Sequence, residues 1–156
     1  MKHVVIYCDG ACPGNPGPGA VAYRIKVDGE IKIEQVHPFP ETTTNQRMEL
    51  TAAIESLIEA SNMDEKSESI TVYSDSHYLV EGMNSWIATW MKNGWRNSKK
   101  KPIENQDLWL KLKLLSSQFK IDWIETRGHA DDKNNNFVDE LARDTAQGLK
   151  LINSPI

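Results

Sequence analysis

The sequence predicts one α/β domain, built on a five-stranded mixed sheet with helices on its faces. Three β-rich runs follow one another before residue 44 without a helical pattern between them, which indicates an antiparallel meander. Two later β-rich runs alternate with amphipathic helical patterns, and parallel pairing of such strands requires helical crossovers. The length of 156 residues fits a single domain with one hydrophobic core.

The first three strands are expected at residues 4–8, 20–27 and 31–36. Asp28-Gly29, between the second and the third, predicts a type I′ hairpin turn. Between the first and the second, residues 10–19 hold four glycines and three prolines, which predicts tight, irregular turns. We expect residues 38–44 to form a loop that leads into the first helix.

Helices and strands alternate in the rest of the chain. The first helix begins after Thr44 or Asn45, either of which can cap it, and has its apolar stripe at Leu50, Ala53, Ile54, Leu57 and Ile58. A polar linker at 62–69 follows. Further strands are expected at 70–74 and 121–126, and further helices from near Ser76, around 108–115 and around 138–145. We expect residues 1–150 to form the domain and 151–156 a C-terminal tail.

Composition favours a soluble, cytoplasmic protein. No apolar run approaches the roughly 20 residues of a membrane helix, and the N-terminus lacks the features of a signal peptide. Cys8 and Cys12 are expected to be reduced packing or turn residues. One domain with a polar surface predicts a monomer.

The charge is unevenly distributed. Residues 86–113 hold seven basic and two acidic residues, a net charge of +5, which leaves −9 for the remainder because the whole chain carries −4. A basic segment on an acidic body suits a polyanion bound at one face.

Four acidic residues stand at positions that favour a shared site. Asp9 and Asp75 follow predicted strands, whereas Glu49 and Asp139 lie early in predicted helices. If the first and fourth strands are neighbours, the four carboxylates can meet beyond the strand ends. Mutual repulsion would then favour a hard divalent cation such as Mg²⁺. Taken singly, each acid is more often a turn or cap residue.

The sequence around these acids resembles type I ribonuclease H of bacteria. Five stretches carry the resemblance, in the order of that family, and cover most of the chain from Val4 to about Gln147: YCDGACPGNPGPGA, TTTNQRMELTAAIESL, VYSDSHYLVEGMNSWI, KNGWRNSKKKPIENQDLW and RGHADDKNNNFVDELAR. The resemblance implies the ribonuclease H-like fold, with strand order 3-2-1-4-5 and helices on both faces of the sheet.

The resemblance also implies an activity: hydrolysis of the RNA strand of RNA–DNA hybrids, leaving 3′-hydroxyl and 5′-phosphate ends. Asp9, Glu49, Asp75 and Asp139 match the carboxylates that hold two Mg²⁺ ions in that family, and Mn²⁺ is expected to substitute. His129 matches a loop histidine that moves protons or assists product release. His77, which follows Asp75-Ser76 where many members carry glutamine, departs from the family's pattern.

Residues of four groups match nucleic-acid contacts of the family. The Gly-rich turn and nearby amides are expected to reach the minor groove: Gly10, Ala11, Cys12, Asn15, Asn45 and Gln46. A DNA phosphate would be held by Thr44 and Asn105. The DNA channel would be lined by Trp86, Trp90 and Ser98. A basic protrusion would hold Lys92, Arg96, Lys99, Lys100 and Lys101.

Alternatives remain at this stage. The two tryptophans, four residues apart, equally fit a helix face packed on the core. The fold and its carboxylates also occur in DNA-cutting resolvases and integrases, and a hybrid-binding module that does not cut is a third reading. The Gly/Asn turn and the Trp/Lys segment favour a hybrid over DNA, and the complete set of acids favours cutting over binding alone.

Overall fold

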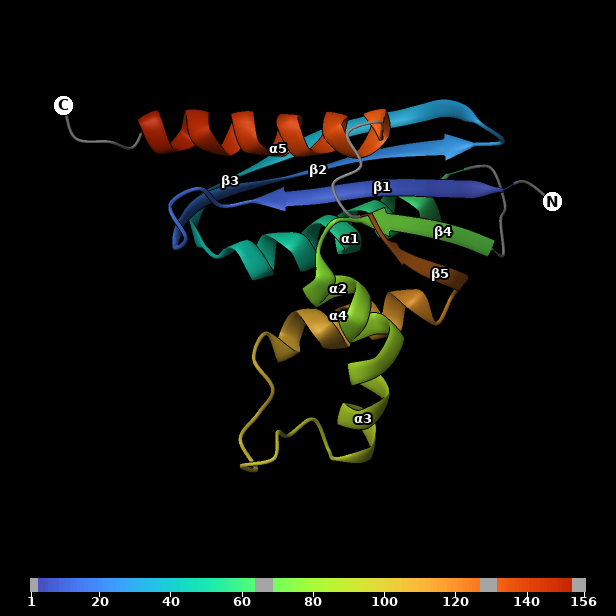
Figure 1. Ribbon diagram of the computed structural model, residues 1–156, viewed down its shortest axis with the longest axis vertical. Coiled ribbons are helices and arrows are strands. Elements are labelled where there is room, and N and C mark those ends of the chain that lie inside the picture. Colours follow the sequence, from blue (N-terminus) through green and yellow to red (C-terminus); the bar gives the residue numbers. More distant parts are fainter. Residues whose placement is uncertain (1–2, 64–68, 127–131, 153–156) are drawn as a thin grey trace.

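The computed structural model describes residues 3–63, 69–126 and 132–152. A single five-stranded sheet has the order β3-β2-β1-β4-β5, as predicted. The helix α5 covers one side of the sheet, and α1, α2 and α4 lie on the other side (Figure 1). Both faces are therefore covered, which confirms the predicted architecture.

The strands divide into an antiparallel half and a parallel half. The first half consists of β1 (Val4–Ala11), β2 (Gly17–Val27) and β3 (Glu30–Thr43). Parallel to β1 run β4 (Ser69–Ser74) and then β5 (Lys120–Glu125). Asp28 and Gly29 have φ angles of 50° and 84°, the positive values that the predicted type I′ turn requires.

The helices occur in the predicted order, but the helix predicted from near Ser76 is divided into α2, a π-helical stretch and α3. They are α1 (Asn45–Ser61), α2 (His77–Glu81), α3 (Ile87–Lys92), α4 (Gln106–Ser116) and α5 (Lys133–Ile152). Between α2 and α3 lies one π-helical stretch, η1 (Gly82–Trp86). A Cβ on Gly82 would lie 2.1 Å from the ring of Trp109, so glycine is needed where this stretch meets α4.

The main core lies between the sheet and α1. Four of the residues predicted for the stripe of α1, Leu50, Ala53, Ile54 and Leu57, are buried there. A smaller cluster of Ala22, Val138 and Ala142 joins α5 to the opposite face. Cys8 and Cys12 are free and buried, as expected. Across the described helices, none combines the length and apolar character that crossing a membrane takes.

Two predicted boundaries are wrong. Residues 38–44 are not a loop, because β3 continues to Thr43 and includes Pro38 and Pro40. Proline is tolerated there because β3 is an edge strand, on which half of the N–H groups face no partner strand. Residues 10–19 are also more regular than predicted: β1 runs to Ala11 and β2 begins at Gly17.

Candidate active site and nucleic-acid interface

Three of the four candidate carboxylates meet at one end of the β1–β4 pair. Tyr7 pairs with Tyr73 in the parallel register, so the residues two positions further along lie side by side. Asp9 lies within β1, which continues to Ala11, and not after its end as the sequence predicted, whereas Asp75 directly follows β4 as predicted. Asp139 belongs to α5, which lies on the face of the sheet opposite to α1. Single carboxylate oxygens of Asp9, Asp75 and Asp139 all lie within 4.8 Å of one another. The sequence-based expectation that these acids gather is thus met in the geometry.

Gly10 brings the fourth carboxylate to the same end of the sheet. A Cβ on Gly10 would lie 2.2 Å from the carbonyl carbon of Met48, so only glycine lets β1 pack this closely on α1. Glu49 follows Met48 and is half-buried. Its Oε2 accepts a hydrogen bond of 2.6 Å from Ser76 Oγ, which itself caps α2 by accepting from Leu79 N. Glu49 is therefore tied to the residue next to Asp75.

The electrostatics of the cluster oppose full ionisation. Burial raises the pKa of Asp9, and the nearby charges of Asp75 and Asp139 raise it further, against one hydrogen bond from Gly10 N. Burial and the charge of Asp139 raise the pKa of Asp75. Burial also raises the pKa of Glu49, although the bond from Ser76 opposes the shift. A hard cation with oxygen ligands would relieve this repulsion, so the donor set fits Mg²⁺.

Asp139 differs from its neighbours because it has a cationic partner. Arg143 Nη1 donates to Asp139 Oδ2 at 2.8 Å, one helical turn away. The two side chains are 39% and 55% exposed, so the ion pair is weak and leaves Asp139 able to bind another cation. The predicted His129 and the acidic Asp131 lie outside the described residues. Asp132 caps α5 by accepting from Asn135 N.

A pocket gathers five of the predicted nucleic-acid-binding residues and one acidic residue. Its volume is about 460 Å³, and its lining consists of Asn15, Thr44, Asn45, Gln46, Glu104 and Asn105. The turn and α1 are joined at this pocket because Cys12 N donates to Asn45 Oδ1 and Asn45 N donates to Asn15 Oδ1. Both amide oxygens are used in these bonds, so the amide nitrogens remain as donors.

Not every residue of the Gly-rich turn offers its side chain to a ligand. Cys12 is buried, and its Sγ contacts the carbonyl oxygens of Gly17 and Thr43 at 3.4 Å. Gly10 and Ala11 pair with β2 as part of β1. A contact of these three residues with nucleic acid would therefore involve mainly their backbone or, for Ala11, a half-exposed methyl group.

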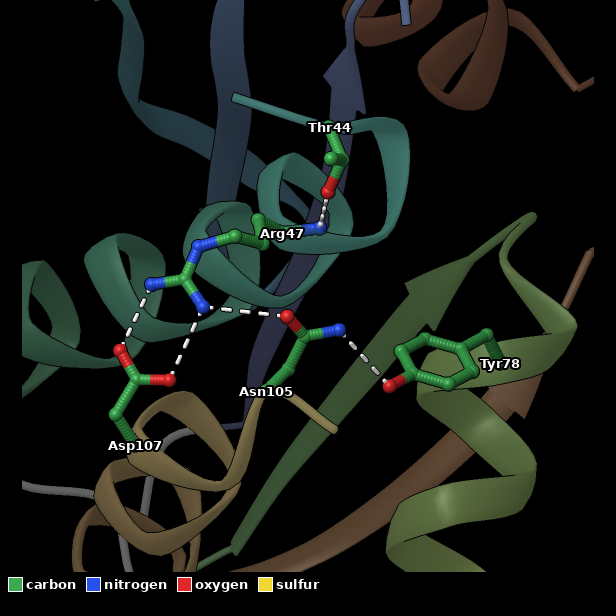
Figure 2. Close-up of polar contacts among 5 residues, drawn as sticks. All are labelled: Thr44, Arg47, Tyr78, Asn105 and Asp107. Atoms are coloured by element: carbon green, nitrogen blue, oxygen red, sulfur yellow. Dashed lines mark hydrogen bonds and ion pairs between the residues drawn. The ribbon is translucent and has the colours of Figure 1, made fainter. Parts of the chain in front are cut away.

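Asn105 is held from two sides (Figure 2). Arg47 Nη1 donates to its Oδ1 at 3.2 Å, and its own Nδ2 donates to the Tyr78 hydroxyl at 3.2 Å. Arg47 also forms a two-pronged ion pair with Asp107, with distances of 3.0 and 2.7 Å. Thr44, the observed cap of α1, accepts from the backbone N–H of Arg47. Asn105 itself has a φ of 57°, a left-handed conformation that asparagine tolerates well.

The two tryptophans predicted for the DNA channel belong to a cluster of aromatic rings. Trp86 and Trp90 lie 6.1 Å apart between ring centres, and Trp90 lies 5.2 Å from the fully buried Trp109. Both rings remain half-exposed. The two interpretations left open by the sequence are therefore compatible, since Trp90 packs on the core, Trp86 packs against Trp90 and Tyr78, and part of each indole remains exposed to solvent.

The predicted basic residues lie on a segment that projects from the body of the protein. In Figure 1, α3 and the chain that follows it extend away from the sheet. All the basic side chains predicted there are exposed: Lys92, Arg96, Lys99, Lys100 and Lys101. Ser98, which was predicted to line the DNA channel, lies on the same segment and is also exposed. Asn97 organises the tip, because its Oδ1 accepts from the backbone N–H groups of Lys99 and Lys101.

Comparison with known proteins identifies the family. The model of the RNase H family matches residues 1–147. The chain belongs to the RNase H family. It is 44% identical over 152 residues to a ribonuclease H of Moorella thermoacetica, a match that covers 96% of this chain and 95% of the relative. Such relatives make the chain an enzyme, an endonuclease that hydrolyses phosphodiester bonds.

Solved structures agree with the fold. The chain is similar to LC9-RNase H1, a type 1 RNase H, with a TM-score of 0.82 and 28% identity over 96% of this chain and 74% of that one. It is also similar in fold to LC11-RNase H1, solved in complex with an RNA/DNA hybrid, with a TM-score of 0.66 and 21% identity over 92% and 99% of the two chains.

Several residues of this RNase H site escaped the sequence-based reasoning. Glu104 lines the pocket, and Arg47 and Tyr78 orient Asn105. Arg47 and Asp107 are 60 residues apart, so no local pattern could have revealed their pairing. In contrast, the spacing of Asp139 and Arg143 by four residues in a predicted helix was a usable signal for an ion pair.

Proposed function

We propose that the carboxylate site hydrolyses the RNA strand of RNA–DNA hybrids with two Mg²⁺ ions, held by Asp9, Glu49, Asp75 and Asp139. The observation that carries the proposal is the convergence of three of these acids within 4.8 Å, with the fourth fixed by Ser76 beside Asp75. When bound, the ions would lower the pKa of the attacking water and neutralise charge on the leaving 3′-oxygen. Hydrolysis would leave 3′-hydroxyl and 5′-phosphate ends.

The residues of the site divide the remaining tasks. Asp9, 6% exposed, would provide a rigid ligand, since its Oδ1 is fixed by Gly10 N. Asp139, half-exposed and only weakly paired, would adjust as the substrate enters and leaves. His129 is proposed to move protons or assist product release, on the strength of its RGHADDKNNN motif alone. Mn²⁺ is expected to replace Mg²⁺ because it takes the same oxygen ligands in octahedral geometry.

The pocket and the aromatic cluster would bind the two strands of the hybrid. The amide nitrogens of Asn15 and Asn45 would donate, and the amide of Gln46 can both donate and accept, which suits 2′-hydroxyl groups and base edges in the minor groove. Thr44 and Asn105 would hold a phosphate of the DNA strand in the pocket. The half-exposed faces of Trp86 and Trp90 would contact deoxyribose, and the basic protrusion would add salt-dependent affinity. A structural neighbour with a bound hybrid supports this substrate class.

The wider setting is also a proposal. We propose a monomer of one domain over residues 1–150 with a tail of 151–156, although α5 itself continues to Ile152. We place the enzyme in the cytoplasm, where the two free cysteines would stay reduced.

The metal chemistry is tested by cleavage of a labelled hybrid in Mg²⁺ and in EDTA. The Asp9→Asn variant removes one ligand charge at nearly constant shape, and Asp28→Asn, at the exposed hairpin turn, is the matched control. The expected result is cleavage by the wild type and the control in Mg²⁺ only, with Asp9→Asn slower by about 10²- to 10³-fold, the scale of losing a group that stabilises charge in the transition state. Undiminished cleavage by Asp9→Asn, or cleavage in EDTA, would refute the assignment.

A further inference from the structure

We propose that Arg47 and Tyr78 are positioning residues: they lock the side chain of Asn105 in the one orientation that serves the pocket, and so control affinity for the hybrid. The inference rests on the proposed function, because it takes the ligand of the pocket to be a phosphodiester group of the hybrid. It adds to that function two residues from separate helices, Arg47 of α1 and Tyr78 of α2, neither of which lines the pocket itself.

The orientation of the Asn105 amide follows from the chemistry of its two partners. A guanidinium group has only donors, so the atom of Asn105 that faces Arg47 must be the oxygen. The nitrogen then faces the Tyr78 hydroxyl, which accepts one of its two N–H groups. The amide cannot flip without losing both bonds. One N–H remains on a residue that lines the pocket, as a donor for a phosphate oxygen.

Both partners are themselves held in place. Arg47 is fixed by the two-pronged pair with Asp107, which lies in the first turn of α4. The Tyr78 hydroxyl accepts a second bond, of 3.1 Å, from Nε1 of the fully buried Trp109. Figure 2 shows Asn105 between the two partners, at the start of α4. Residues of three helices therefore fix the side-chain amide of Asn105. Its position at the start of α4 does not explain this, because its side chain makes no capping hydrogen bond.

The pocket depends on such restraint because its own charges do not attract a phosphate. None of its six lining residues is basic, and Glu104 carries a negative charge. Both terminal nitrogens of Arg47, the nearby cation, are engaged by Asp107. Binding must then rely on neutral donors at fixed positions, among them the free N–H of Asn105 and the Thr44 hydroxyl, whose oxygen already accepts from Arg47 N. Hydrogen bonds of this kind lose their value when the donor is free to rotate.

A double-mutant cycle tests the inference on the intact enzyme. Tyr78→Phe keeps the ring and removes the hydroxyl, and Asn105→Gly removes the amide while tolerating the left-handed backbone. Tyr78→Phe is expected to raise KM for the hybrid roughly 3- to 10-fold, the value of about one hydrogen bond, with kcat changed by less than about twofold. In the Asn105→Gly background the same substitution should leave KM unchanged. Tyr73→Phe, which alters a tyrosine stacked on Tyr7 instead, is the matched control and should leave both constants unchanged.

A second variant and a second condition separate positioning from folding. Arg47→Lys keeps the charge but lacks the planar fork that pairs with Asp107 through two nitrogens and holds Asn105 at the same time, so it should reproduce the rise in KM and its loss in Asn105→Gly. Because the affected donor is neutral, the KM ratio of Tyr78→Phe to wild type should be the same at low and high salt.

Equal effects of Tyr78→Phe with and without the Asn105 side chain would overturn the inference, and so would a fall in kcat at constant KM. These results are distinct from failure of the proposed function, in which the wild type itself would not cut the hybrid.

Discussion

Replacing Asp9 by asparagine is expected to stabilise the metal-free protein at neutral pH, although it removes a proposed metal ligand. The substitution keeps the size of the side chain and the oxygen that accepts from Gly10 N. It removes a buried carboxyl group that faces two other carboxylates, those of Asp75 and Asp139, and must either carry an unfavourable negative charge or bind a proton. A site that holds cations is therefore destabilised by repulsion among its carboxylates when no metal is bound.

The size of the effect follows from the geometry. At 4.8 Å, the separation within which the three oxygens lie, two unit charges repel by about 3.5 kcal/mol at an effective dielectric constant of roughly 20. Asp9 escapes part of this cost by binding a proton, so we expect a net stabilisation of about 2–4 kcal/mol. For a protein of this size, such a change raises the melting temperature by roughly 5–15 °C.

The pH dependence has a definite sign. The pKa of Asp9 is higher in the folded protein than its ordinary value of 3.8. The protonated carboxyl therefore costs the folded state nothing below about pH 4, and stability is lost as the pH rises from there through the folded pKa. The advantage of Asp9→Asn should accordingly be small near pH 4, grow towards neutral pH, and shrink in saturating Mg²⁺, which binds the native wild type.

The assay is thermal unfolding, followed by circular dichroism, of the wild type, Asp9→Asn and the surface control Asp28→Asn. Each is measured in EDTA at pH 4 and pH 7, and again at pH 7 with Mg²⁺. A lower melting temperature for Asp9→Asn at pH 7 in EDTA would refute the reasoning, and a gain equal at both pH values would show that charge is not its cause.

Three further substitutions test separate parts of the account. Glu104→Gln removes the negative charge of the pocket and should lower KM for the hybrid about 2- to 5-fold at low salt, a gain that titration with KCl should abolish. Ser76→Ala removes the cap of α2 and the donor to Glu49, so calorimetry should show a loss of about 1 kcal/mol and kinetics a lower kcat at similar KM. Gly10→Ala places a methyl group against the backbone of Met48 and pushes β1 away from α1. Unfolding by urea should therefore show a loss of about 1–3 kcal/mol in the free energy of unfolding, together with reduced cleavage.

Features fixed by short stretches of sequence could be predicted well. Thr44 caps α1 through an N–H three residues later, and the Asp28-Gly29 turn is specified by two residues that tolerate positive φ. The meeting of Asp9 and Asp75 was also within reach, because parallel neighbouring strands bring residues of matching register side by side near one edge of a sheet, although β1 continues past Asp9 to Ala11. The extent of β3 was not, since Pro38 and Pro40 usually end a strand and only its position at the edge makes them acceptable.

Features that depend on distant pairs of residues could not be predicted from the sequence. The glycine at position 10 was expected to serve a turn near the substrate, whereas it is required because α1 packs against β1. The amide of Asn105 is oriented by Arg47, 58 residues away, and by Tyr78, 27 residues away. Only the folded arrangement of α1, α2 and α4 brings these three residues together.

The central claim is that this RNase H site cuts RNA only when it is paired with DNA. The most direct test incubates the enzyme and Mg²⁺ with three labelled duplexes of one sequence: RNA–DNA hybrid, DNA and RNA. We expect cleavage of the RNA strand of the hybrid alone, with 5′-phosphate ends on the products. Cleavage of the DNA duplex would instead indicate a resolvase-like nuclease, and tight binding of the hybrid without cleavage would contradict the catalytic role of the carboxylates.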